Sequence, residues 1–147
     1  LVCVIVLLAI LSVSAFLSWP GTSIHIGAEA NQVANDLRYT QALAMAKGQR
    51  FYLQLSSTTT YRIVSNSGIS VVNAMGGTTT TLMNGLSFGT LSNLPNSLLA
   101  FDSNGTPYID TASPGTALAA TASIPIVGGG KTATISITPV TGRVVVQ

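Results

Sequence analysis

The feature that most constrains this chain is an uncharged apolar run at the start of the sequence. It extends from Leu1 to Leu17 and reads LVCVIVLLAILSVSAFL. As an α-helix continued to Trp19 it would be roughly 28 Å long, close to the roughly 30 Å hydrocarbon thickness of a bilayer. Few soluble helices are apolar on every side. We therefore predict that residues 1–19 form a membrane-spanning helix.

Two other interpretations of this run are possible. A secretory signal peptide requires a basic segment before its apolar core and small residues at its cleavage site. Nothing basic precedes Leu1 here, and Phe16, Leu17 and Trp19 stand where small residues are required. The second alternative is a buried core helix of a soluble domain, which the absence of any polar face disfavours.

Composition limits what the remaining chain can do. Only 7% of the 147 residues are charged and the formal net charge is +2, so no basic field strong enough to indicate nucleic acid by itself is present. Cys3 is the only cysteine and His25 the only histidine, which excludes an intrachain disulfide and a structural zinc site within one chain.

Residues 20–48 form the second part of the predicted helix. Pro20 and Gly21 interrupt the helical pattern, so a break or kink is expected there. Lys47 and Gly48 give a basic last turn followed by a glycine, which is typical of a helix C-terminus. Between the break and this end, one face of the helix is apolar at helical spacing, and the opposite face carries Asn31, Gln32, Asn35 and Arg38. The apolar face is therefore predicted to pack on a sheet. This face comprises Ala30, Val33, Ala34, Leu37, Ala44 and Met45.

Residues 49–147 have the alternation of short β-strands and contain no second helical pattern. Because crossover helices are missing, the strands are expected to be antiparallel. Glycine and proline separate the expected strands, and long loops are expected at 73–81 and 111–123. The strands are predicted at 51–55, 61–64, 69–72, 79–83, 98–101, 106–109, 124–127, 132–137 and 144–146. The fold class is therefore α+β, a long N-terminal helix on a small antiparallel β domain.

Three motifs in this pattern resemble a known family. The helix end LRYTQALAMAKGQR, from Leu37 to Arg50, runs into a strand, FDSNGTP follows at 101–107, and Gly142-Arg143 lies in the last strand. The chain is similar in these respects to type IV pilins and pseudopilins, and in particular to FimT-like minor pilins and H-type type II secretion pseudopilins. Members of that family begin with a segment of the type F-T-L-I-E, and Leu1 corresponds to the residue that follows its glutamate.

The resemblance implies a role in filament assembly. It implies other pilin subunits as partners, the inner membrane as the location before assembly, and processing by a prepilin peptidase and an assembly platform. An apolar helix is stable both in lipid and in a bundle of like helices, so one subunit can pass between the two. The residues expected to pack in the filament core are Val2, Val6, Ala9, Ile10, Val13 and Ala15.

The candidate enzyme and metal motifs of this sequence each lack residues or a structural context that their chemistry requires. Residues 125–132 read PIVGGGKT, which ends like a phosphate-binding loop, but the chain continues with strand alternation rather than a helix, so a glycine hairpin is favoured. Asp102 and Asp110 lack the glycine and glutamate positions of a calcium loop. His25 has no accompanying nucleophile motif. We assign no catalytic residue, no metal ligand and no cofactor.

Two functions therefore remain beside the structural subunit of a type IV pilus or secretion pseudopilus. Some FimT-like pilins take up DNA through a C-terminal G-R-x-R pattern, which here reads Gly142-Arg143-Val144-Val145, without the second arginine. Lys131 and Arg143 would contact phosphates if their strands placed them on one face. The second alternative is a membrane-anchored extracytoplasmic binding domain that never enters a filament.

Overall fold

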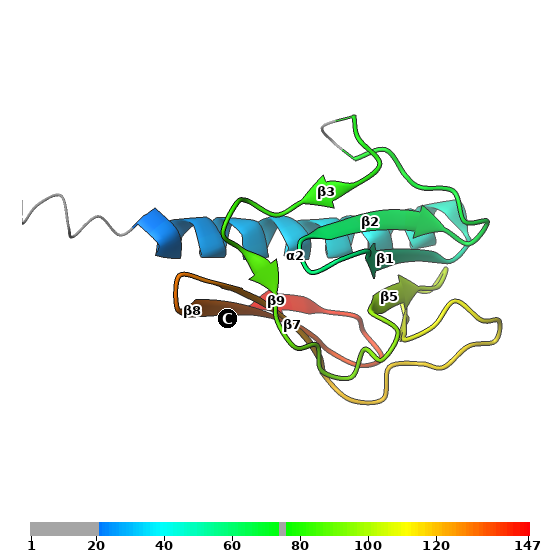
Figure 1. The fold of residues 1–147 in the computed structure, drawn as a ribbon. Helices are drawn as coiled ribbons and strands as arrows, with labels where there is room; N and C mark the ends of the chain where they lie inside the picture. Colours follow the sequence, from blue (N-terminus) through cyan, green and yellow to red (C-terminus); the bar gives the residue numbers. More distant parts are fainter. Residues whose placement is uncertain (1–20, 74–75) are drawn as a thin grey trace, which may run out of the picture.

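In the part of the chain that the structure describes, one helix, α2, spans Gly21–Lys47 and lies along the whole length of the β domain (Figure 1). The computed structural model describes residues 21–73 and 76–147, with side chains from residue 25 onward. The helix contacts β1 and β5 of one sheet and β7, β8 and β9 of the other. One stripe of small and branched side chains makes these contacts and is fully or almost fully buried: Ile26, Ala30, Val33, Ala34, Leu37 and Ala44.

The end of α2 follows from one glycine. Gly48 has φ 64°, in the left-handed region where a side chain is unfavourable, and the chain leaves the helix there. This confirms the end expected from Lys47 and Gly48. Met45, expected on the buried face, is 49% exposed, so that expectation was wrong. Successive helical residues lie about 100° apart, and with Ala44 against the sheet Met45 is turned toward the side of the domain.

The first sheet has five strands in the order β3-β2-β1-β5-β6. Its strands are β1 (Phe51–Leu55), β2 (Thr60–Ser65), β3 (Thr80–Thr81), β5 (Leu98–Phe101) and β6 (Pro107–Tyr108). All pairs are antiparallel, and β1 lies between β2 and β5 with Leu53 opposite Ile63 and Leu99. These three side chains are buried, so the alternation of β1 directs its apolar residues to the core.

The second sheet has four antiparallel strands in the order β4-β7-β8-β9. They are β4 (Ser87–Phe88), β7 (Ala122–Gly128), β8 (Lys131–Ile137) and β9 (Val144–Val146). Ile124, Ile126, Ile135 and Ile137 are fully buried and pack with the helix stripe in one core. The α+β class with antiparallel strands, expected from the sequence, is therefore confirmed.

One expected strand is absent, and one observed strand was not expected. Residues 69–72 do not form a strand and make only the single bridge of Ser70 with Val64, and Ile69 and Val72 are exposed. Conversely, β4 was missed because it is only two residues long and is fixed by a distant partner, with Ser87 opposite Val127. A short strand of this kind depends on non-local pairing, which a local pattern does not contain.

Candidate interaction surfaces

The apolar run and its break lie outside the part of the chain that the structure describes. Val2, Val6, Ala9, Ile10, Val13, Ala15 and Pro20 belong to this excluded part, and Gly21 is the first described residue of α2. No helix within residues 21–73 and 76–147 is long and apolar enough to cross a bilayer. The three residues expected to hold the helix on the sheets, Val33, Leu37 and Ala44, are completely buried in the core.

The side of α2 that faces β2 and β3 carries two carboxylates. The Tyr61 hydroxyl donates to Asp36 Oδ2 at 2.6 Å, and the Glu29 side chain is buried against the segment after β3, where the backbone of Met83 hydrogen-bonds it. Burial raises the pKa of both carboxyl groups above their usual values, although these hydrogen bonds oppose the rise. Burial first, and then Asp36, also raise the pKa of Tyr61.

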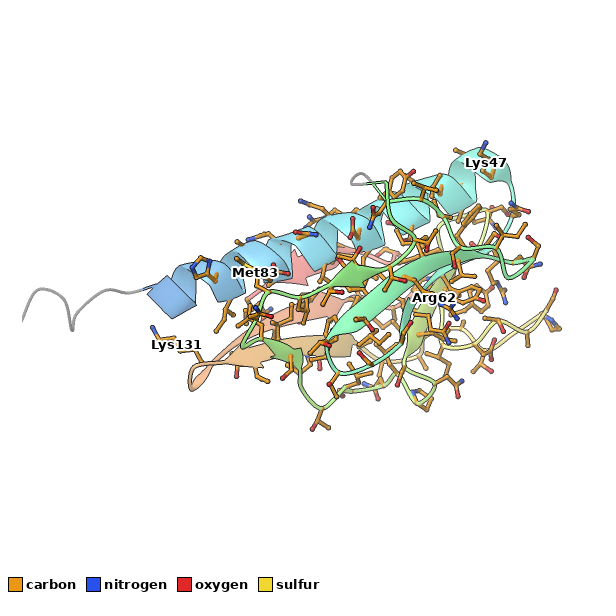
Figure 2. The ribbon with its side chains drawn as sticks, turned by 45° about the horizontal axis from the view of Figure 1, so that its top comes forward. Lys47, Arg62, Met83 and Lys131 are labelled. Atoms are coloured by element: carbon orange, nitrogen blue, oxygen red, sulfur yellow. The ribbon has the colours of Figure 1, made fainter. Side chains whose placement is uncertain are left out.

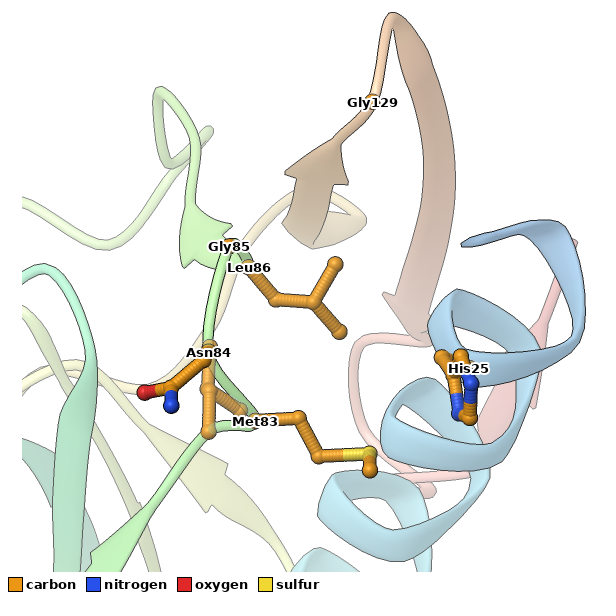
Figure 3. A pocket seen from close by; sticks show the side chains of 7 residues that line it. His25, Met83, Asn84, Gly85, Leu86 and Gly129 are labelled. Carbon is orange, nitrogen blue, oxygen red and sulfur yellow. The ribbon is translucent and has the colours of Figure 1, made fainter. Parts of the chain in front are cut away.

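A pocket of about 700 Å³ lies beside the first turns of α2 (Figure 3). Met83 and Leu86 point toward His25 across the pocket, whereas Asn84 points away from it. The segment with Met83 and Gly85 lies opposite the helix, and Gly129, in the turn between β7 and β8, lines another side of the pocket. No group of three or more histidine, cysteine, aspartate or glutamate side chains that would hold a metal ion occurs in the described residues, at this pocket or elsewhere.

Arg50 fixes the loop between β6 and β7 to the end of the helix. Its guanidinium lies 4.1 Å from the centre of the Tyr108 ring and donates to the carbonyl oxygens of Ala112 and Pro114. Asp110 accepts the amides of Ala112 and Thr116, at 3.2 and 2.9 Å. Hydrogen bonding by Thr116 above all, with a smaller effect of the nearby Arg50, lowers the pKa of Asp110.

The glycine segment at 128–131 is a hairpin, as expected. Gly128 pairs with Lys131, and Gly129 and Gly130 both have positive φ, the conformation of a tight turn between antiparallel strands. Figure 2 shows Lys131 beside the first turn of α2, at the end of the domain opposite Lys47.

The structure does not bring Lys131 and Arg143 together, so the condition for a shared basic face is not met. The Thr138 amide donates to the Arg143 carbonyl, which places Arg143 opposite Thr138, seven residues along from Lys131. Seven residues of strand span roughly 23 Å. Alternation also places Lys131 and Thr138 on opposite faces of the sheet. Pairing of β8 with β9 thus separates the two charges.

Arg143 instead lies near Arg38 of the helix, in a groove between α2 and β9. We call this the α2–β9 groove; its volume is about 570 Å³ and it is lined by Asn31, Arg38, Gln41, Arg143, Val144, Val145 and Val146. Arg38 donates to Asn35 Oδ1 at 2.7 Å and to the Val144 carbonyl at 2.9 Å. Sequence reasoning missed this pair because the two arginines are far apart in the chain and only the tertiary fold joins them.

The turn before Arg143 is tightly constrained. The Thr141 amide donates to the Pro139 carbonyl at 2.7 Å, which closes a three-residue turn around Val140, and Val140 has φ 67° although it is β-branched. Gly142 has φ 63°, and a Cβ there would lie 2.8 Å from both the Gln41 side chain and the Phe101 ring. A glycine at 142 therefore lets the turn lie against the helix and sets the position of Arg143.

This fold and these motifs are those of a known family. The family model described as "Type II transport protein GspH" matches residues 29–142, from the middle of α2 to the turn before β9. The chain belongs to the GspH family. The pilin and pseudopilin membership expected from the helix end and the β domain is thereby confirmed.

Solved structures of GspH-like proteins share the fold. The minor pseudopilin EpsH from the type 2 secretion system of Vibrio cholerae is 16% identical with a TM-score of 0.63, over 84% of this chain and 96% of that one. The type IV minor pilin FimU of Pseudomonas aeruginosa is 16% identical with a TM-score of 0.59, over 86% and 90%. No curated protein matches the sequence.

Proposed function

We propose that this GspH-family chain is a non-enzymatic subunit of a type IV filament, either a type IV pilus or a type II secretion pseudopilus. The observation that carries the proposal is the family match over residues 29–142, which includes α2 from residue 29 onward and eight of the nine strands named above. In this proposal residues 1–19 form the membrane and filament-core segment, residues 20–48 the helix that carries the domain, and residues 49–147 the exposed β domain.

The arrangement of the helix supports this role. The first described turns of α2 extend beyond the strands (Figure 1), and the apolar run from Leu1 to Leu17 precedes this end of the helix in the sequence. An apolar run in that place can pack in a bilayer before assembly and against other subunits afterwards. The partners are then other pilins, the inner membrane, a prepilin peptidase and an assembly platform, with the β domain on the extracytoplasmic side.

DNA uptake is not proposed. The two basic residues that the sequence offered, Lys131 and Arg143, lie at opposite ends of β8 and on opposite faces of the sheet. Separated single charges give weak phosphate binding at physiological salt. An anchored binding domain that stays in the membrane is the alternative that the experiment below distinguishes.

The test is recovery of the chain in filaments sheared from cells, quantified by mass spectrometry against the other pilins. Recovery near the level of the main pilin would identify a major subunit, and trace recovery a minor one. Absence from the filament fraction, with the chain still present in membranes, would contradict the proposal and favour the anchored domain.

A further inference from the structure

The outer edge of β9 exposes backbone groups that are not paired. Thr134 and Gln147 exchange amide-to-carbonyl hydrogen bonds of 2.9 Å, so Gln147, Val145 and Arg143 direct their backbone groups toward β8. Val144 and Val146 direct theirs away from β8. Among the described residues, only the Val144 carbonyl on this edge has a partner, which is Arg38. The amide and carbonyl of Val146 and the amide of Val144 remain available.

The groove beside this edge is positively charged and contains no acid. The chain has four acidic residues, and each has its contacts elsewhere. Glu29 lies against Met83, Asp36 accepts from Tyr61, Asp102 accepts the amides of Asn104 and Thr106, and Asp110 accepts those of Ala112 and Thr116. Arg38 and Arg143 therefore line the α2–β9 groove without an acidic side chain among the lining residues.

We propose that the α2–β9 groove receives an extended, acidic segment of another filament subunit, which adds to β9 as a fifth strand of the sheet. The partner's origin rests on the proposed function, whereas its chemistry follows from the groove. Strand addition takes its affinity from main-chain hydrogen bonds at a free sheet edge. Val146 supplies one donor and one acceptor at the spacing of a strand. Arg38, whose guanidinium reaches the Val144 carbonyl, and Arg143 both line the groove.

The chemistry of the edge favours a peptide over nucleic acid. A phosphodiester offers only acceptors, which would leave the outward carbonyl of Val146 without a donor. A peptide backbone satisfies both groups of Val146. Side chains of an added strand alternate between faces, so a carboxylate two or three residues beyond the residue opposite Val146 lies near Arg38 or Arg143.

A photo-crosslinking experiment tests the contact in cells that assemble the filament. Benzoylphenylalanine is placed at the half-buried position beside the edge, Val145→benzoylphenylalanine, and as a matched control on the exposed face of the other sheet, Arg62→benzoylphenylalanine (Figure 2). We expect position 145 to give an adduct with an acidic, strand-forming peptide of another subunit. Position 62 should not give that adduct.

Two sets of substitutions test whether the adduct depends on the backbone edge of β9 and on the charge of the α2–β9 groove. Val146→Pro removes only the outward amide, since this residue donates nothing to β8, and edge strands tolerate proline in such positions. The pair Arg38→Glu and Arg143→Glu keeps the edge and reverses the charge, and Lys131→Glu is the control for charge alone. We expect at least a ten-fold loss of adduct from each of the first two and no loss from the control. If the Val146→Pro protein does not accumulate in cells, the adduct yield of the Arg38→Glu and Arg143→Glu variant tests the inference.

The outcomes separate this inference from the proposed function. If the chain is recovered in sheared filaments but the adduct is absent or is insensitive to both sets of changes, the inference is wrong and the filament role stands. If the chain is absent from filaments, the filament role is wrong. Amide exchange of the detergent-solubilised full chain then tests whether the groove binds an acidic peptide. The probe is then an acetylated hexapeptide of alternating threonine and valine that ends in two glutamates.

In that second arm the peptide should slow exchange of the Val146 amide at least ten-fold at millimolar concentration, and the same peptide ending in two lysines should not. Unchanged exchange with the acidic peptide would overturn the inference. Protection of the same amide by a DNA duplex, with none by the peptide, would assign the groove to phosphate instead.

Discussion

Arg50 and Arg143 each directly precede a strand, Arg50 the central strand β1 and Arg143 the edge strand β9, but the structure uses them differently. Arg50 lies on Tyr108 and binds two carbonyl groups of its own loop, near the carboxylate of Asp110. Arg143 lies with Arg38 in a groove that no acidic side chain lines. The first region is closed by contacts within the subunit, whereas the second leaves both charge and backbone groups for a partner. Arg50 therefore belongs to surface that stabilises the domain, and Arg143 to surface that is available for assembly.

The largest expected effect is on the packing that both regions share. Leu37 is fully buried between α2 and the sheets. We expect Leu37→Ala to lower the free energy of unfolding by about 2–5 kcal/mol, because the cavity cannot collapse completely. Urea unfolding followed by circular dichroism measures the change. Met45→Ala, at an exposed position of the same helix, is the control and should lower it far less.

The closed region should show a moderate effect when Arg50 is removed. Arg50→Ala leaves the carbonyls of Ala112 and Pro114 without their donor and removes the contact with Tyr108, so we expect a loss of about 1–2 kcal/mol. Urea unfolding gives the value, and amide exchange in the loop at 110–116 should become faster. Unchanged exchange in that loop would show that Arg50 does not hold it.

A smaller effect is expected from the pH dependence of the buried acid. The pKa of Glu29 is raised by burial, so the folded state holds its proton to a higher pH than the unfolded state does. Glu29 therefore lowers stability as the pH rises from its usual value of 4.5 through the raised one. We expect Glu29→Gln to be relatively more stable than the parent chain at pH 7 than at pH 4. Thermal unfolding at both values measures this, and an equal difference at the two would contradict it.

The smallest effect on stability is expected in the open region. Arg143→Ala removes no side-chain hydrogen bond or ion pair with the described residues, because the hydrogen bonds of Arg143 in the turn are made by its backbone groups. We expect a change within about 0.5 kcal/mol. A loss of stability as large as that of Arg50→Ala would show that the Arg143 side chain also stabilises the domain, contrary to the distinction between the two regions.

Much of this fold was predictable because its signals are local. The end of α2 at Gly48, the β1–β2 hairpin and the hairpin at Gly129 and Gly130 depend on residues close together in the sequence, and the structure has them. Burial of Ala30, Val33 and Leu37 likewise follows from helical spacing.

The errors concern features that distant residues decide. Residues 69–72 have strand composition but find only one bridge partner, and β4 has little strand composition but finds β7. Arg143 was paired with Lys131 because both lie near the last strands, although register separates them and the fold places Arg38 beside the groove instead. Pairing, register and grooves between elements are properties of the tertiary structure.

The way in which α2 lies across both sheets has a mechanical consequence. Its buried stripe runs from Ile26 to Ala44, about 27 Å of helix, and contacts strands of both sheets along that length. A force along the helix axis would act on all of these contacts at the same time, in shear. It would not break them one after another. A subunit held by its helix would therefore resist axial tension with its whole core at once.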